Sequence, residues 1–284
     1  MDDASFFIIG ANGQLGKALH AKYPDARSAD IDELDIADSE SVANFDWSGV
    51  KVILNAAAYT DVDAAETAEG RTAAWQVNAV AVGNLVKAAF KNNLTLVHIS
   101  TDYVFDGTKS PHSETEPFSP LNVYGQSKAA GDIIVNLVPK HYLLRTLWVI
   151  GDGKNFVRTM LELGQKGVSP TVVADQTGRL TFTTQLVAAI DHLLKTEAAF
   201  GTYNVSNDGD VISWAEVTRC IFKEAGFDLT VTDTTTAEYF ANKPDSAPRM
   251  MQSELDLSKI KAAGLQLADW RDDLKKYIEK ETAQ

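Results

Sequence analysis

The chain has 284 residues, 45% of them hydrophobic and 23% charged, which suits a globular protein with one large α/β domain and a smaller lobe. Its formal net charge of -13 disfavours a nucleic-acid partner, because binding to phosphate backbones depends on Lys and Arg. The single cysteine, Cys220, excludes an internal disulfide and a cysteine zinc cluster. We also expect no membrane partner and a cytoplasmic location, since no stretch approaches ~20 apolar residues and the N-terminal apolar run is too short for a secretory signal.

Short apolar runs alternate with helical patterns in the first half of the chain, which is typical of a parallel, doubly wound sheet of the Rossmann type. The predicted strands of this half are residues 5–9, 26–29, 50–54, 94–100 and 141–147. The predicted helices are residues 14–22, one long helix over 73–91, and 124–137. We therefore expect residues 1–151 to form a nucleotide-binding domain.

The pattern is looser beyond residue 151, and we expect residues 152–284 to form a smaller C-terminal α/β lobe. The predicted helices there are residues 156–166, 184–195, 213–225 and 270–280, and the predicted strands are 171–174 and 202–205. Residues 230–248 are rich in Thr and contain two prolines, which predicts loop or extended structure. Chain crossings between the two parts are expected to blur the boundary.

A glycine-rich segment, GANGQLG, follows the first predicted strand and opens a helix. Glycine permits a tight turn, close approach to a pyrophosphate and packing of helix on strand, while the helix N-terminus offers N–H groups to phosphate. An ordinary loop is the alternative, but the position after the first strand favours a dinucleotide site. The residues expected to contact the cofactor are Gly10, Asn12, Gly13, Gln14, Leu15 and Gly16.

Asp30 ends the second predicted strand, about twenty residues beyond the glycine loop, where a carboxylate accepts from the adenosine ribose hydroxyls. The alternative is a solvated turn carboxylate, since Asp32, Glu33 and Asp35 follow it closely. No Arg or Lys stands just after Asp30 to hold a 2′-phosphate. The sequence therefore favours NADH over NADPH.

Tyr124 and Lys128 lie four residues apart, so on a helix they share one face. Reduction of a carbonyl needs a proton donor at its oxygen, and a tyrosine is a neutral acid at pH 7. A neighbouring ammonium lowers the cost of losing that proton and can hold the nicotinamide ribose. Thr101, at the end of the fourth strand, can orient the carbonyl, with Ser100 as the alternative hydroxyl or a cofactor contact. The structural alternatives are an aromatic ring stacked on a lysine stem and a threonine that caps its own backbone.

The GxxGxxG spacing resembles the extended short-chain dehydrogenase/reductase superfamily. Longer motifs over most of the chain resemble the dTDP-4-dehydrorhamnose reductase family: NAAAYTDVDAAE (55–66), STDYVFDG (100–107), PLNVYGQSK (120–128), RTLW (145–148) and DQ (175–176). The resemblance implies NADH- or NADPH-dependent reduction of dTDP-4-dehydro-L-rhamnose to dTDP-L-rhamnose, with a nucleotide sugar as partner. A homodimer is compatible with it.

The resemblance also implies roles for single residues. Further cofactor contacts are Asp35, Ile36, Ala56, Ala57, Ala58 and Asn78. Substrate contacts are Thr60, Val62, Tyr103, Trp148, Asn155 and Arg249. Core packing is the alternative for Trp148, and capping of the acidic stretch that follows is the alternative for Arg249. The five histidines lack ligand spacing, so we expect no metal site.

Other members of the superfamily that eliminate water carry an Asp-Glu pair after the active-site threonine, whereas here Asp102 is followed by Tyr103. This pair suits positioning of a substrate rather than elimination. The chain departs from the family pattern at residues 177–181, at Ile150 and around Arg249. These departures leave open the identity of the sugar and the nucleotide.

Two other functions are compatible with these motifs. One is a non-catalytic, NAD(P)-binding regulatory subunit, against which the complete set of Thr101, Tyr124 and Lys128 argues. The other is a different sugar-nucleotide reductase or epimerase of the same fold.

Overall fold

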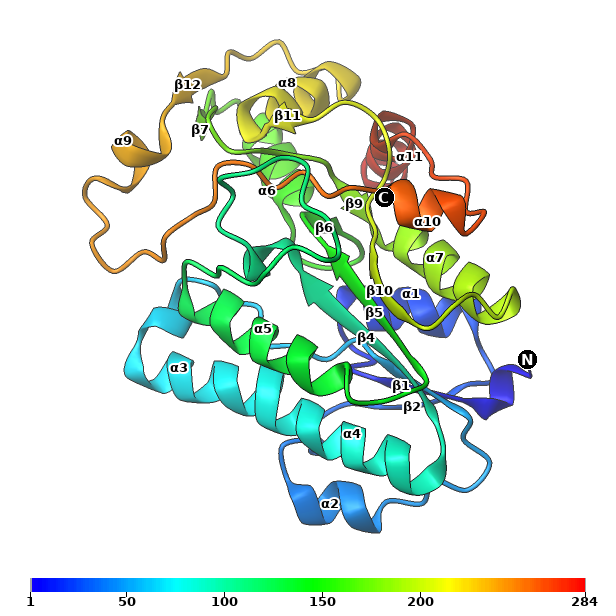
Figure 1. Ribbon diagram of the computed structural model, residues 1–284. Coiled ribbons are helices and arrows are strands. Elements are labelled where there is room, and N and C mark those ends of the chain that lie inside the picture. The colour runs from blue at the N-terminus through cyan, green and yellow to red at the C-terminus, as the bar shows by residue number, and fades with distance from the viewer. Residues whose placement is uncertain (1, 284) are drawn as a thin grey trace.

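The computed structural model describes residues 2–283, and these contain a six-stranded sheet in the order β10-β5-β4-β3-β1-β2 (Figure 1). All neighbouring strands in this sheet are parallel. The strands are β1 (Phe6–Ile9), β2 (Arg27–Ala29), β3 (Val52–Asn55), β4 (Thr95–Thr101), β5 (His141–Thr146) and β10 (Gly201–Asn204). The predicted doubly wound α/β fold is confirmed. The strand order reverses between β1 and β3, which is where such sheets bind ligands at the carboxyl ends of their strands.

Helices cover both faces of this sheet, as Figure 1 shows. One face carries α1 (Gln14–Lys22) and α7 (Thr183–Lys195), and the other carries α2 (Ser39–Asn44), α3 (Ala68–Trp75), α4 (Ala81–Asn92) and α5 (Val123–Val135). Strand β1 is buried on both faces because its side chains alternate between two cores: Phe6 and Ile8 pack in one, and Phe7 and Ile9 in the other. The sheet is thereby held between two helical layers.

The second part of the chain has a core of its own, centred on the fully buried Trp270. Its helices are α6 (Phe156–Gln165), α8 (Trp214–Glu224), α9 (Thr236–Phe240), α10 (Ser258–Ala262) and α11 (Trp270–Thr282). Its short strands are β6 (Val149–Ile150), β7 (Thr171–Val173), β8 (Thr177–Gly178), β9 (Thr181–Phe182), β11 (Ile212–Ser213) and β12 (Thr232–Thr234). The chain returns to the large sheet at β10, so the boundary at residue 151 stays a prediction.

Two predictions of secondary structure were wrong. The single helix over residues 73–91 is α3 and α4 with the π-helical turn η3 (Gln76–Val80) between them, and it starts at residue 68. Residues 230–248, predicted as loop or extended structure, contain the strand β12 but also the helix α9, whose capping box joins Thr235 and Glu238. Within the described residues, each helix is too short or too polar to cross a bilayer.

Candidate active site

The glycine loop lies directly against the segment that follows β3. Gly10 has a φ of +79°, and a Cβ atom there would lie 2.7 Å from the backbone nitrogen of Ala57. At Gly16, a Cβ atom would lie 2.1 Å from the carbonyl oxygen of Gly10. Any side chain at these positions would fill the turn or push the loop off its neighbours. Gly13 is the N-cap of α1, so the first N–H groups of this helix open onto the loop.

A cavity of about 310 Å³ lies beside this loop, at the carboxyl ends of β1, β2 and β3. The residues expected at the cofactor that line it are Gly10, Gly13, Asp30, Asp35, Ile36, Ala56, Ala57 and Ala58. The carboxylate of Asp30 accepts hydrogen bonds from the backbone nitrogens of Asn12 (2.9 Å) and Ile31 (2.8 Å), which fix it at the cavity. Asn12 takes part through its backbone.

A second cavity, of about 460 Å³, continues along the ends of β3, β4 and β5. The expected site residues that line it are Gly13, Gln14, Leu15, Ala56, Ala58, Thr60, Val62, Ser100, Thr101, Tyr103, Tyr124, Lys128 and Trp148. Gly13, Ala56 and Ala58 line both cavities, so the two form neighbouring parts of one cleft. The structure therefore brings the expected catalytic residues to the end of the expected cofactor site.

Tyr124 stands in the first turn of α5, which Asn122 caps by accepting a hydrogen bond from the nitrogen of Gly125 (2.8 Å). Thr101 lines the same cavity as Tyr124, and its hydroxyl donates a hydrogen bond to Asp102 at 2.8 Å. Burial raises the pKa of Tyr124 above its ordinary value, and the Thr101 hydroxyl opposes that rise. Tyr124 is therefore a neutral proton donor at pH 7.

Lys128, one turn further along α5, donates a 2.6 Å hydrogen bond to the carbonyl oxygen of Ile99. Burial lowers its pKa to about 8, and the charge of Asp132 opposes this shift. The sequence predicted that this ammonium lowers the pKa of Tyr124. In the structure, the pKa of Tyr124 is shifted by burial, by the Thr101 hydroxyl and by the negative charge of Asp102, while the Lys128 amino group is bonded to Ile99. The effect of the ammonium on Tyr124 stays a prediction.

A buried ion pair underlies this part of the cleft. The Nε atom of Arg145 lies 3.0 Å from a carboxylate oxygen of Asp132, and both side chains are almost fully buried. The Arg145 guanidinium also donates to the carbonyl oxygen of Glu114 and lies over the rings of Phe105 and Phe118. Burial raises the pKa of Asp132, whereas the positive charge of Arg145 opposes the rise. Arg145 thus joins β5 to α5 and lines neither part of the cleft.

Sequence reasoning missed two features of the cleft. Asp102 is buried, and this burial raises its pKa to about 6 in spite of hydrogen bonds that favour the carboxylate. His98 is buried, with Nε2 3.5 Å from the Lys128 Nζ atom and Nδ1 2.9 Å from the side-chain nitrogen of Asn55. The available signal was spacing, since His98 and Ser100 are two apart on a strand and share a face.

Three expected contact residues have other partners. The Asn78 side chain is bonded to the backbone of Tyr59 and to Ser127, so it fixes the loop after β3 against α5. Asn155 caps α6 and donates to Gly151 and to the Tyr277 hydroxyl. These two residues line neither part of the cleft.

Arg249 also lies outside the lining of the cleft. Its guanidinium donates to the Asp63 carboxylate at 2.7 Å and to the carbonyl oxygen of Ala247 at 3.1 Å. These two bonds use two of the five N–H donors of the guanidinium. Among the described residues, no group of three or more His, Cys, Asp or Glu side chains is arranged to hold a metal ion.

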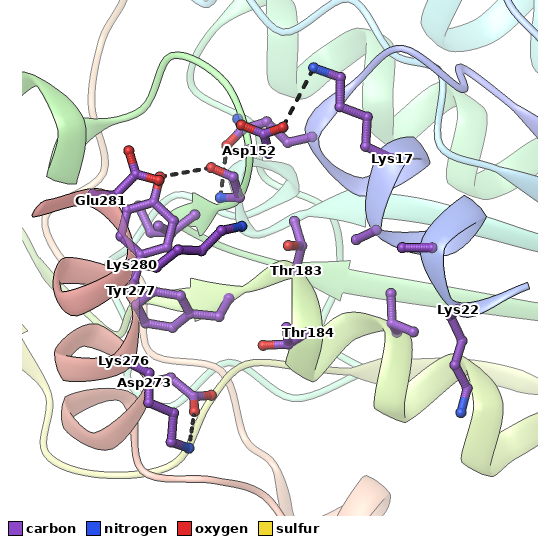
Figure 2. A pocket seen from close by; sticks show the side chains of 17 residues that line it. Lys17, Lys22, Asp152, Thr183, Thr184, Asp273, Lys276, Tyr277, Lys280 and Glu281 are labelled. Atoms are coloured by element: carbon purple, nitrogen blue, oxygen red, sulfur yellow. Dashed lines mark hydrogen bonds and ion pairs between the residues drawn. The ribbon is translucent and has the colours of Figure 1, made fainter. Parts of the chain in front are cut away.

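A larger cavity, of about 700 Å³, lies between α1, α7 and α11 (Figure 2). Its charged side chains pair among themselves or with neighbours: Lys17 with Asp152, and Lys276 with Asp273. Gln14 is the expected site residue that reaches it, and its side-chain oxygen accepts a hydrogen bond from the nitrogen of Gly151 at 2.8 Å. The residues expected to be catalytic line the smaller cavity at the ends of β3, β4 and β5, not this larger one.

Comparisons with known proteins agree with this geometry. A family model described as the RmlD substrate binding domain matches residues 4–283. A dTDP-4-dehydrorhamnose reductase of Aggregatibacter actinomycetemcomitans is 37% identical, over 96% of this chain and 97% of that protein. The crystal structure of a dTDP-4-dehydrorhamnose reductase from Clostridium acetobutylicum has a TM-score of 0.91 at 34% identity, covering 98% of this chain and 99% of its own. That of the Bacillus anthracis enzyme in complex with NADP has a TM-score of 0.88 at 35% identity, covering 97% of both chains.

Proposed function

The chain belongs to the family of the RmlD substrate binding domain, and on this premise we propose that it reduces the 4-keto group of a nucleotide-linked 6-deoxy sugar with NADH or NADPH. The substrate would be dTDP-4-dehydro-L-rhamnose and the product dTDP-L-rhamnose, as for the relatives that bear the name dTDP-4-dehydrorhamnose reductase. The observation that carries this proposal is that Thr101, Tyr124 and Lys128 line one cavity, which adjoins the cavity at the glycine loop.

The residues around the glycine loop fit a nicotinamide dinucleotide. Side chains are excluded at Gly10 and Gly16, where a Cβ atom would meet backbone, so the loop can approach a pyrophosphate closely. Asp30 is half-buried in the glycine-loop part of the cleft, where its carboxylate would accept hydrogen bonds from ribose hydroxyls. When bound, the cofactor supplies the hydride that reduces the carbonyl carbon.

The protein contributes positioning and a proton. Tyr124, neutral at pH 7, would donate its hydroxyl proton to the carbonyl oxygen as negative charge develops there. Thr101 would hydrogen-bond the same oxygen and hold it against Tyr124. The Lys128 ammonium would stabilise the phenolate that remains and bind the ribose beside it.

The rate of reduction should fall at alkaline pH. The pKa of Lys128 is lowered to about 8, so the side chain is charged below that pH and loses its charge above it. The pKa of Tyr124 is raised, so this hydroxyl remains protonated over the same range. We expect kcat/KM to fall by roughly tenfold per pH unit above about pH 8. A profile that stays flat well above pH 8 would contradict this, and the residual activity of Lys128→Arg, charged throughout, should lack the decline.

Asp30 should control the choice between the two nicotinamide cofactors. Its carboxylate would repel the 2′-phosphate of NADPH, so Asp30→Ser should raise the preference for NADPH over NADH by about tenfold in kcat/KM. Asp32→Ser is the matched control, because Asp32 is exposed and lines neither part of the cleft. An unchanged ratio in Asp30→Ser would remove Asp30 from cofactor recognition.

Incubation of the protein with dTDP-4-dehydro-L-rhamnose tests the proposed function. The nicotinamide absorbance should decline with NADH or with NADPH and stay constant when the keto sugar is omitted. Cofactor binding without any oxidation would favour a regulatory subunit instead, a function for which the Thr101–Tyr124 hydroxyl pair has no use. A homodimer and a cytoplasmic location remain part of the proposal. Ile133 on α5 and Leu137, two residues beyond the end of α5, are exposed and offer apolar surface for a homodimer.

A further inference from the structure

Trp148, which follows β5 and lines the catalytic part of the cleft, has a φ of +44°. A bulky side chain at positive φ is a genuine conformational outlier. Such backbone strain persists where the surroundings determine the conformation, and it occurs preferentially at ligand sites. The groups around Trp148 therefore determine the position of its indole.

Three contacts fix Trp148. The ring of Trp214 stacks on it, with centroids 3.6 Å apart and an angle of 20° between the planes. Gly178 leaves room for the indole, because a Cβ atom there would lie 3.0 Å from its Cε2 and Cζ2 atoms. The backbone nitrogen of Thr181 donates to the Trp148 carbonyl oxygen at 3.1 Å.

The short two-stranded sheet of β8 and β11 positions Gly178 and Trp214 beside Trp148. Strands β8 and β11 are antiparallel, with Gly178 opposite Ile212. Ser213 ends β11 and caps α8 with Glu216, so Trp214 is the first residue of that helix and has little freedom. Phe156, the first residue of α6, packs on Trp214 with a centroid distance of 4.4 Å. A row of aromatic rings thus runs from the cleft into the second core.

We propose that Trp214 is a positioning residue that holds Trp148 as a wall of the site for the nucleotide sugar. The inference rests on the proposed function. Trp148 lines the cleft beside Tyr124, whereas the expected ribose contact Asp30 lines the other cavity. Loss of the stack should therefore weaken binding of the sugar nucleotide and spare the adenosine half of the cofactor.

Trp214→Leu should raise the KM for dTDP-4-dehydro-L-rhamnose by about tenfold, because a stacked aromatic pair contributes of the order of one factor of ten beyond the burial of its surface. The KM for the nicotinamide cofactor and kcat should stay close to the wild-type values. Trp214→Phe keeps an aromatic ring on Trp148 and should restore most of the affinity. Trp75→Leu, an exposed position on α3 outside the cleft, is the matched control and should leave both KM values unchanged.

The outcomes separate the two proposals. A wild-type protein that reduces no nucleotide sugar contradicts the proposed function, and the role of Trp214 falls with it. An active wild type with an unchanged KM in a folded Trp214→Leu variant overturns the positioning role alone. Equal increases of both KM values, or a Trp214→Phe variant as impaired as Trp214→Leu, would likewise show that Trp214 supports the lobe in general rather than Trp148.

Discussion

Tyr124→Phe should lower kcat by about 10²–10⁴-fold, the contribution of a positioned general acid, while the Kd of the nicotinamide cofactor changes little. The substitution removes the hydroxyl from the cavity that Thr101 also lines. It keeps the ring, which packs edge-on against Tyr103 with centroids 5.6 Å apart. Stopped-flow or steady-state oxidation of the cofactor measures the first effect, and a fluorescence titration measures the second.

Tyr103→Phe is the matched control for this result. Tyr103 lines the same cleft and carries the same hydroxyl, and burial raises its pKa to about 12. The proposal assigns no proton transfer to the Tyr103 hydroxyl, so we expect the kcat of this variant to stay near the wild-type value. A Tyr103→Phe variant as inactive as Tyr124→Phe, or a Tyr124→Phe variant with substantial turnover, would assign the proton to another group.

Arg145→Met should lower the free energy of unfolding by about 3–5 kcal/mol, because it leaves the Asp132 carboxylate buried without its cation. The pKa of Asp132 is already raised by burial, and loss of the arginine should raise it further. Urea unfolding of the variant, monitored by circular dichroism, measures the loss.

Two further variants locate the origin of that loss. Arg145→Met combined with Asp132→Leu should recover much of the stability, since no charge is then left unpaired. Arg271→Met removes one partner of an exposed pair with Asp210 and should cost at most about 1 kcal/mol. A loss in Arg145→Met no larger than that in Arg271→Met would contradict the account of a buried pair.

The features that local sequence determines were predictable. The alternation of Phe6 to Ile9, the glycine loop and the spacing of Tyr124 and Lys128 each depend on neighbours within about one helical turn or one strand. The structure places these segments as predicted, because a parallel sheet brings the carboxyl ends of its strands to one edge. The position of the candidate site, at the carboxyl ends of the parallel strands, could therefore be predicted from the sequence.

What the sequence did not reveal depends on contacts between distant segments. The π-helical turn at residues 76–80 leads Asn78 to bonds with Tyr59 and Ser127, and periodicity cannot show such a turn. The pKa of Asp102 depends on how many groups bury it. An Asn before a helix is also an N-cap, and Asn155 caps α6, so its contact with a substrate stays a prediction.

Transfer of hydrogen to the sugar is the central claim, and isotope transfer tests it most directly. The protein would be incubated with dTDP-4-dehydro-L-rhamnose and a nicotinamide cofactor that carries deuterium at the transferred position, and the product analysed by mass spectrometry and NMR. The account predicts dTDP-L-rhamnose with one deuterium at C4. A product without deuterium at C4, or no product with either cofactor, would contradict it.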